Sequence, residues 1–138
     1  MTHLLRMTVL TILATACLSA GDFRIIANPS VPVSAISFEE FQHVFLEVKA
    51  TLADGTHVEP VLQKGGRAHQ AVLRECLGKT DLALVAYYRG LVFTGKGFMP
   101  KVLDSNSAVA AYVARTKGAI GYVSADTNTP GVKTLEVK

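Results

Sequence analysis

HVEPVLQKGGRAHQAVLREC, residues 57–76, is the stretch that decides the fold, because the chain changes there from one kind of secondary structure to another. The run HVEPVL, residues 57–62, is short, mostly apolar and preceded by a turn, which predicts a buried strand. Gly65 and Gly66 follow shortly after this run, and residues 67–78 then carry apolar side chains at helical spacing. A strand that leads through a glycine turn into a helix is typical of an α/β protein.

The helix expected over residues 67–78 should bury one side and end at Gly78, since glycine readily adopts the left-handed conformation that closes a helix. The residues expected on its buried side are Ala71, Val72, Cys76 and Leu77. Cys76 is therefore interpreted as a buried, inert thiol rather than as a nucleophile.

The rest of the chain continues the alternation of strands and helices. Strands are expected over residues 23–28, 57–62, 100–103, 119–125 and 131–137, and helices over residues 37–45, 67–78, 80–93 and 105–116. The segment 82–93 is almost wholly apolar, so we expect it to be well covered. This order predicts an α/β fold with a mostly parallel or mixed sheet and helices on both faces.

Residues 1–21 are predicted to be a signal peptide, because Arg6 precedes an apolar run that ends in small residues. Cleavage after Ala20 or Gly21 is expected. The alternative is lipoprotein processing, with a lipid anchor at Cys17 as the membrane attachment. Residues 22–138 then form one domain, and the protein is expected to be periplasmic or otherwise extracytoplasmic.

Composition narrows the classes of function. Lys and Arg number 14 against 11 Asp and Glu, and the basic residues are scattered, which suits a small anion but not a nucleic acid. His43, His57 and His69 stand apart, are expected at the surface or rim, and indicate neither a metal nor a cofactor. An enzyme is not expected, because no serine lies in a nucleophile elbow and no histidine–carboxylate pair is visible from spacing.

Three segments together resemble the phosphate-type periplasmic solute-binding proteins of ABC transporters. They are FEEFQHVFLEVKATLADGTHVEPV (38–61), YYRGLVFTGKG (87–97) and YVARTKGAIGYVSA (112–125). The resemblance runs from about Phe23 to Ser124 and is closest to short, single-domain members. It implies a single lobe of a type 2 periplasmic-binding-protein fold, and a role in binding a small oxyanion such as phosphate.

The candidate site is the turn Lys64, Gly65, Gly66 and Arg67, which occupies the place of the oxyanion loop in the family that the chain resembles. The first amides of a helix have no intrahelical partners, and glycines let an anion approach the backbone. In that family the loop also carries serine and threonine, whereas residues 63–68 have no hydroxyl. The alternative is an ordinary helix start whose amides contact water.

Two functions follow from these observations. The first is an exported solute-binding-like protein that holds a phosphate-like oxyanion at the turn. The second is a non-enzymatic interaction or sensory module, which docks on an ABC permease or on an extracytoplasmic sensor domain without binding phosphate. The second has support because a lobe without its counterpart offers no opposing wall to enclose a small ligand.

Overall fold

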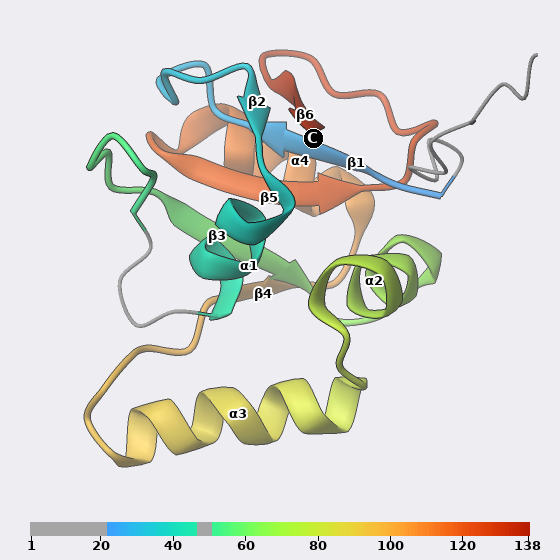
Figure 1. Ribbon diagram of the computed structural model, residues 1–138. Helices are drawn as coiled ribbons and strands as arrows, with labels where there is room; N and C mark the ends of the chain where they lie inside the picture. The colour runs from blue at the N-terminus through green and yellow to red at the C-terminus, as the bar shows by residue number, and fades with distance from the viewer. Residues whose placement is uncertain (1–21, 47–50) are drawn as a thin grey trace, which may run out of the picture.

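A computed structural model describes residues 22–46 and 51–138, which form a six-stranded mixed sheet with helices on both faces (Figure 1). The predicted signal peptide and Cys17 lie outside the described residues. The strands are β1 (Arg24–Ala27), β2 (Ala35–Ile36), β3 (Glu59–Gln63), β4 (Lys101–Leu103), β5 (Ala119–Val123) and β6 (Lys133–Val137). The helices are α1 (Phe38–Leu46), α2 (Arg67–Val72), α3 (Asp81–Phe93) and α4 (Asn106–Arg115), and a π-helical segment, η1 (Leu73–Leu77), continues α2.

The strands lie in the order β2-β6-β1-β5-β3-β4. Strand β1 is antiparallel to both of its neighbours, β5 and β6, whereas the pairs β2–β6, β3–β5 and β3–β4 are parallel. The predicted α/β fold with a mostly parallel or mixed sheet is confirmed. The two-residue strand β2 was not expected, since it is too short to show a period in the sequence.

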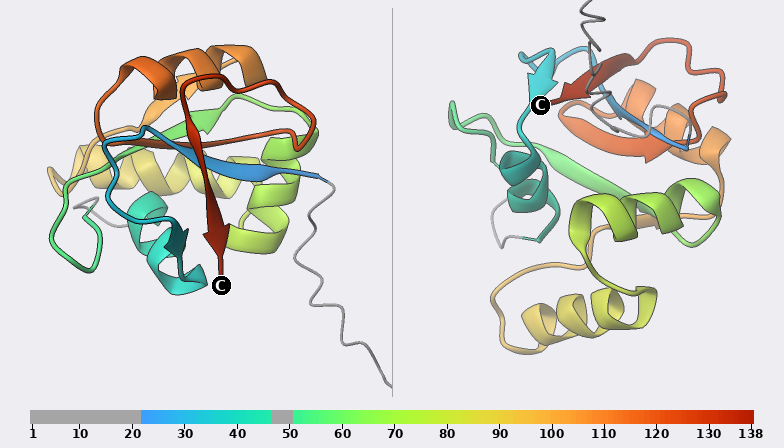
Figure 2. Two further views of the ribbon diagram at one scale, coloured as in Figure 1. Left: turned by 90° about the horizontal axis from the view of Figure 1, so that it is seen from above. Right: turned by 45° about the vertical axis from the view of Figure 1, so that its right-hand side comes forward.

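Alternation along β1 divides the core into two layers. Ile25 belongs to the larger cluster, which α1, α2 and η1 cover, and Ile26 faces the smaller cluster under α4. Figure 2 shows α4 on one side of the sheet and α1 and α2 on the other. Strand β5 is buried along its whole length, as expected of a strand between two layers.

Local capping chemistry sets several of the boundaries. Ser37 and Thr80 accept hydrogen bonds from the amides of Glu40 and Ala83, as N-cap residues do. Residues 37–40 have the Ser-x-x-Glu pattern of a capping box, but the carboxylate of Glu40 accepts from the amide of Ala53 instead of from the amide of Ser37.

Helix α3 is less covered than its composition suggested. Its buried residues are Leu84 and Tyr88, whereas Leu82 is 82% exposed and Phe93 is 92% exposed. The hydroxyl of Tyr88 donates a hydrogen bond to the carbonyl of Phe45, which attaches α3 to the end of α1. The expectation of a well-covered helix is therefore wrong, because the hydrogen bonds between α3 and α1 are made by one side of the helix only.

A buried polar network joins four elements at the hydroxyl of Tyr122. This hydroxyl accepts from the amide of Gln63 at 3.0 Å and lies 2.5 Å from Nδ1 of His69. Burial raises the pKa of Tyr122, so the hydroxyl keeps its proton and can donate it to Nδ1. Nε2 of His69, 2.6 Å from Oδ1 of Asp81, is then the protonated nitrogen and donates to that carboxylate.

We predict that Gly121→Ala destabilises the protein. A Cβ at this position would lie 2.9 Å from Cγ1 of Val109 on α4, inside a packed layer. The expected loss in the free energy of unfolding is about 1–3 kcal/mol, measured by urea denaturation. The control is Gly90→Ala in α3, where a Cβ meets nothing within 4 Å and should stabilise the helix by about 0.5–1 kcal/mol. Equal effects of the two substitutions would contradict this account of the packing.

We also predict that Tyr122→Phe is costly although it removes a single oxygen atom. It leaves a buried amide and a buried imidazole nitrogen without a partner, which should lower the free energy of unfolding by about 2–4 kcal/mol. Tyr112→Phe is the control, since it loses the hydrogen bond to Glu59 at a partly exposed site and should cost less than about 1 kcal/mol. Denaturation curves that rank the two variants in the opposite order would refute the role of this network.

Candidate functional site

The turn between β3 and α2 is built around Gly66. This residue is the N-cap of α2 with φ 97° and ψ 172°, a conformation that favours glycine, and it provides no side-chain cap. The amide of Gln70 makes the hydrogen bond to the carbonyl of Gly66 at 3.0 Å. The amides of Arg67 and Ala68 precede that bond, so they belong to the helical turn whose donors need partners from outside the helix.

Lys64 and Arg67 place two cations beside these amides. Both residues are exposed, and neither forms a salt bridge with a residue that the structure describes. The backbone amide of Lys64 is not available to a ligand, because it donates to the carbonyl of Leu103 at 2.8 Å. The four candidate residues thus lie together on one exposed turn, with side-chain cations and the amides after Gly66 as its donors.

The helix that follows the turn is shorter and less regular than expected. Regular α-helical bonding stops at Val72, and η1 completes the segment to Leu77. The four residues predicted on the inner side are all buried, and Gly78 closes the segment with φ 62°. Cys76 is a buried thiol as predicted, and its burial raises its pKa to about 11, so the nucleophilic thiolate is disfavoured.

The strand end beneath the turn is held by side chains from distant parts of the chain. Nε2 of Gln63 donates to the carbonyl of Tyr122 and to Oδ1 of Asn106, both at 2.8 Å. Asn106 in turn bonds the amide and the hydroxyl of Ser124. The last residue before the turn is therefore fixed to β5 and to the start of α4.

His69 corrects two expectations. It is 2% exposed rather than at the surface or rim, and it pairs with the carboxylate of Asp81, whose side chain is 47% exposed. Its position offered a signal, since residue 69 shares a helical face with Val72 and Cys76. Its partner Tyr122 lies 53 residues away, a distance that sequence spacing cannot bridge. His43 and His57 are exposed as expected.

The Tyr122–His69–Asp81 chain supports the turn rather than acting on a ligand. Tyr122 and His69 are almost fully buried, so neither can touch a molecule in solvent. His69 is on α2, directly after the amides that face the turn, and its two hydrogen bonds fix the orientation of that helix. The arrangement is suited to preorganising backbone donors, which reduces the entropic cost of binding.

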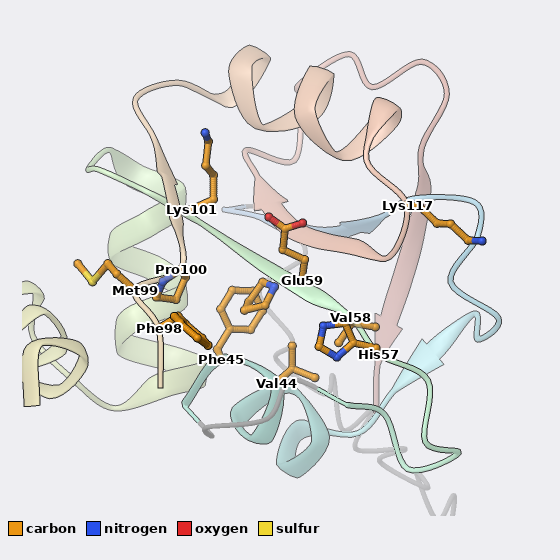
Figure 3. A pocket seen from close by; sticks show the side chains of 11 residues that line it. Val44, Phe45, His57, Val58, Glu59, Phe98, Met99, Pro100, Lys101 and Lys117 are labelled. Carbon is orange, nitrogen blue, oxygen red and sulfur yellow. The ribbon is translucent and has the colours of Figure 1, made fainter. Parts of the chain in front are cut away.

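A separate pocket lies at the opposite end of β3 (Figure 3). Its volume is about 360 Å³, and Glu59, Phe98 and Lys101 are among the residues that line it. The carboxylate of Glu59 accepts from the hydroxyl of Tyr112 at 2.5 Å, and Nζ of Lys101 lies 5.5 Å from the centre of the same ring. The pocket includes none of the four turn residues, and its lining combines the carboxylate of Glu59 with the cations Lys101 and Lys117.

Two further properties concern the described part of the chain. Within residues 22–46 and 51–138, no group of three or more His, Cys, Asp or Glu side chains is placed to hold a metal ion. None of the helices in these ranges has the length and apolar character needed to cross a membrane.

Comparison with known proteins gives similarity of structure but not of sequence. No protein-family model matches the chain, and no curated protein matches its sequence. PstS from Borrelia burgdorferi is similar with a TM-score of 0.62 and 15% identity, over 85% of this chain and 47% of that protein. A putative phosphate ABC transporter substrate-binding protein with bound phosphate, from Clostridium perfringens, is also similar with a TM-score of 0.62. Its sequence is 14% identical over 84% of this chain and 44% of that protein.

An ABC-type phosphate transport receptor from Vibrio cholerae is similar with a TM-score of 0.54 and 14% identity, over 84% of this chain and 46% of that protein. At this identity the likeness concerns the fold. The chain spans a little under half of the length of the structures that it matches. The chain therefore has a periplasmic-binding-protein fold, over a stretch that corresponds to a little under half of these proteins.

Proposed function

We propose that the protein is a non-enzymatic solute-binding protein that holds a small oxyanion of the phosphate type at the turn Lys64–Arg67. The observation that carries the proposal is the start of α2. There, a glycine N-cap without a capping side chain lies between two exposed cations, on a strand end that buried side chains fix in place. Helix N-termini bind anions through free amides and the helix dipole. The similar fold of proteins named for phosphate transport adds support.

The expected affinity is weak, in the millimolar range. The turn is exposed, so a bound anion would keep much of its hydration, whereas tight sites bury most of the ligand. The missing hydroxyls also remove neutral donors that could replace the lost water. Arg67 offers a planar guanidinium that can bond two oxygens of one anion, which makes it the stronger of the two cations.

The proposal includes export from the cytoplasm. Residues 1–21 would act as the signal peptide, with cleavage after Ala20 or Gly21 or with lipid attachment at Cys17. An ABC permease or an extracytoplasmic sensor domain would then be the partner that binds this protein when it carries the anion. The named relatives are transport receptors and substrate-binding proteins, which supports this setting.

The alternative proposal is that the protein is also extracytoplasmic but binds no anion. The turn stands open to solvent, so the domain could instead dock on an extracytoplasmic protein without any anion. A failed anion titration would favour this alternative, whereas saturable binding at the turn would favour the first.

The anion site is tested by titrating the ¹⁵N-labelled protein with phosphate and sulfate at constant ionic strength. We expect saturable shifts of the amides of Gly66, Arg67 and Ala68. Arg67→Ala should weaken binding about ten-fold, the effect of losing one charge-assisted hydrogen bond, and Lys64→Ala should weaken it less.

Lys117→Ala is the matched control, because it removes an exposed cation at the opposite end of β3 and should leave the binding constant unchanged. The proposal fails if no amide of the turn shifts at tens of millimolar phosphate. It also fails if the three variants weaken binding equally, since that result would indicate attraction by net charge alone.

A further inference from the structure

Helix α3 and the segment after it expose a run of large apolar side chains. Single exposed apolar residues are ordinary, but several large ones on one helix and on the segment that follows it indicate a surface that meets something else. We call this group the α3 patch. Its members, with their exposed fractions, are Leu82 (82%), Val92 (51%), Phe93 (92%), Phe98 (90%), Met99 (45%) and Val102 (39%). Figures 1 and 2 show α3 at the outer edge of the molecule.

The geometry of the helix explains why the patch exists. Leu84 and Tyr88 are four residues apart on the buried side. Leu82, Ala86 and Phe93 recur at helical spacing on the opposite side and are exposed. A helix that is apolar on all sides is normally enclosed, so the outward side of α3 lacks the cover that its composition calls for.

The charged side chains nearest in sequence to Phe93 and Phe98 are positive, although Asp81 precedes Leu82 and Glu59 lines the same pocket as Phe98. Residues 82–103 contain Arg89, Lys96 and Lys101 and no Asp or Glu. Arg89 shares the outward side of α3 with Phe93, and Lys96 lies in the exposed glycine turn between Phe93 and Phe98. An occupant of the end of the patch that carries Phe93, Lys96 and Phe98 should therefore combine an apolar phase with negative charge.

This charge pattern argues against a second copy of the chain as the occupant. In a two-fold symmetric dimer the same patch occurs on both sides, so Arg89 and Lys96 of both copies would be brought together in one interface. The position of the two most exposed aromatic residues also matters, because Phe93 and Phe98 lie on either side of the turn 94–97, which follows the end of α3. A lipid surface can admit aromatic side chains on such a turn, and the lipid phosphates attract the neighbouring cations.

We propose that the α3 patch docks on an anionic lipid surface. Phe93 and Phe98 enter the boundary between headgroups and acyl chains, while Arg89 and Lys96 contact lipid phosphates. This attachment is independent of Cys17 and of the anion-binding turn. It places the domain on the membrane without any helix that spans it.

A tryptophan substitution gives a direct test. The chain has no tryptophan, so Phe93→Trp introduces a single emission probe into the patch. We expect a blue shift of its emission with vesicles of phosphatidylglycerol and phosphatidylcholine, and none with phosphatidylcholine alone. The matched control is Phe38→Trp on α1, an exposed phenylalanine outside the patch, which should not shift.

Co-sedimentation of the full chain with the same vesicles gives the second readout. The double variant Phe93→Ser/Phe98→Ser should bind anionic vesicles at least about ten-fold more weakly, since two aromatic rings no longer leave water. Lys96→Glu should weaken binding and reduce its dependence on salt, whereas Lys117→Glu should change it less. Every variant retains residues 1–21, so a contribution of that segment is the same throughout.

Three results would overturn the proposal. The first is an unchanged emission of the Phe93→Trp variant on anionic vesicles. The second is a wild-type dimer that Phe93→Ser/Phe98→Ser converts to a monomer, which would assign the patch to a second copy. The third is a monomer that binds neither kind of vesicle, which would leave a protein with an acidic rim as the occupant.

Discussion

The hydroxyl of Tyr122 is the contact on which the arrangement of the other elements depends. This hydroxyl, on the central strand β5, contacts the amide of Gln63 at the end of β3 and the imidazole of His69 on α2. His69 also contacts Asp81, the first residue of α3. An apolar core alone tolerates small shifts of a helix along a sheet. A buried hydrogen bond does not, because any shift leaves a desolvated donor or acceptor without a partner. The network therefore fixes where α2 begins relative to the strand that precedes it.

This constraint matters at the candidate site because the turn contributes few groups of its own. Its glycines give access to the backbone but no rigidity, and they carry a high conformational entropy in the unfolded chain. The rigidity comes from the buried residues Gln63 and His69 beneath the turn. The position of the donors is thus set by buried residues, and the charge around them by Lys64 and Arg67 at the surface. These two properties can change independently in evolution or by mutation.

The elements that the sequence predicted well are those whose signals are local. Ser37, Thr80 and Gly78 mark helix ends by their own hydrogen bonds or backbone conformation. The residues that determine these helix ends therefore lie within a few positions of one another in the sequence. The burial of His69 was misjudged because its partner Tyr122 lies 53 residues further along the sequence. The burial of α3 was misjudged because the composition of a helix does not show how many neighbouring elements pack against it. The signal peptide and the oxyanion site remain predictions.

The pairing of β1 has a consequence for how the chain reaches its folded state. Arg24 is in register with Val123, and Ile25 with Leu135, so the first described strand finds both of its neighbours near the other end of the sequence. Contacts of such long sequence separation slow folding, because a large loop must close before they form. The sheet cannot assemble around β1 until β5 and β6 have been synthesised. A nascent chain with this connectivity leaves β1 without its neighbours until almost the whole sequence has been made.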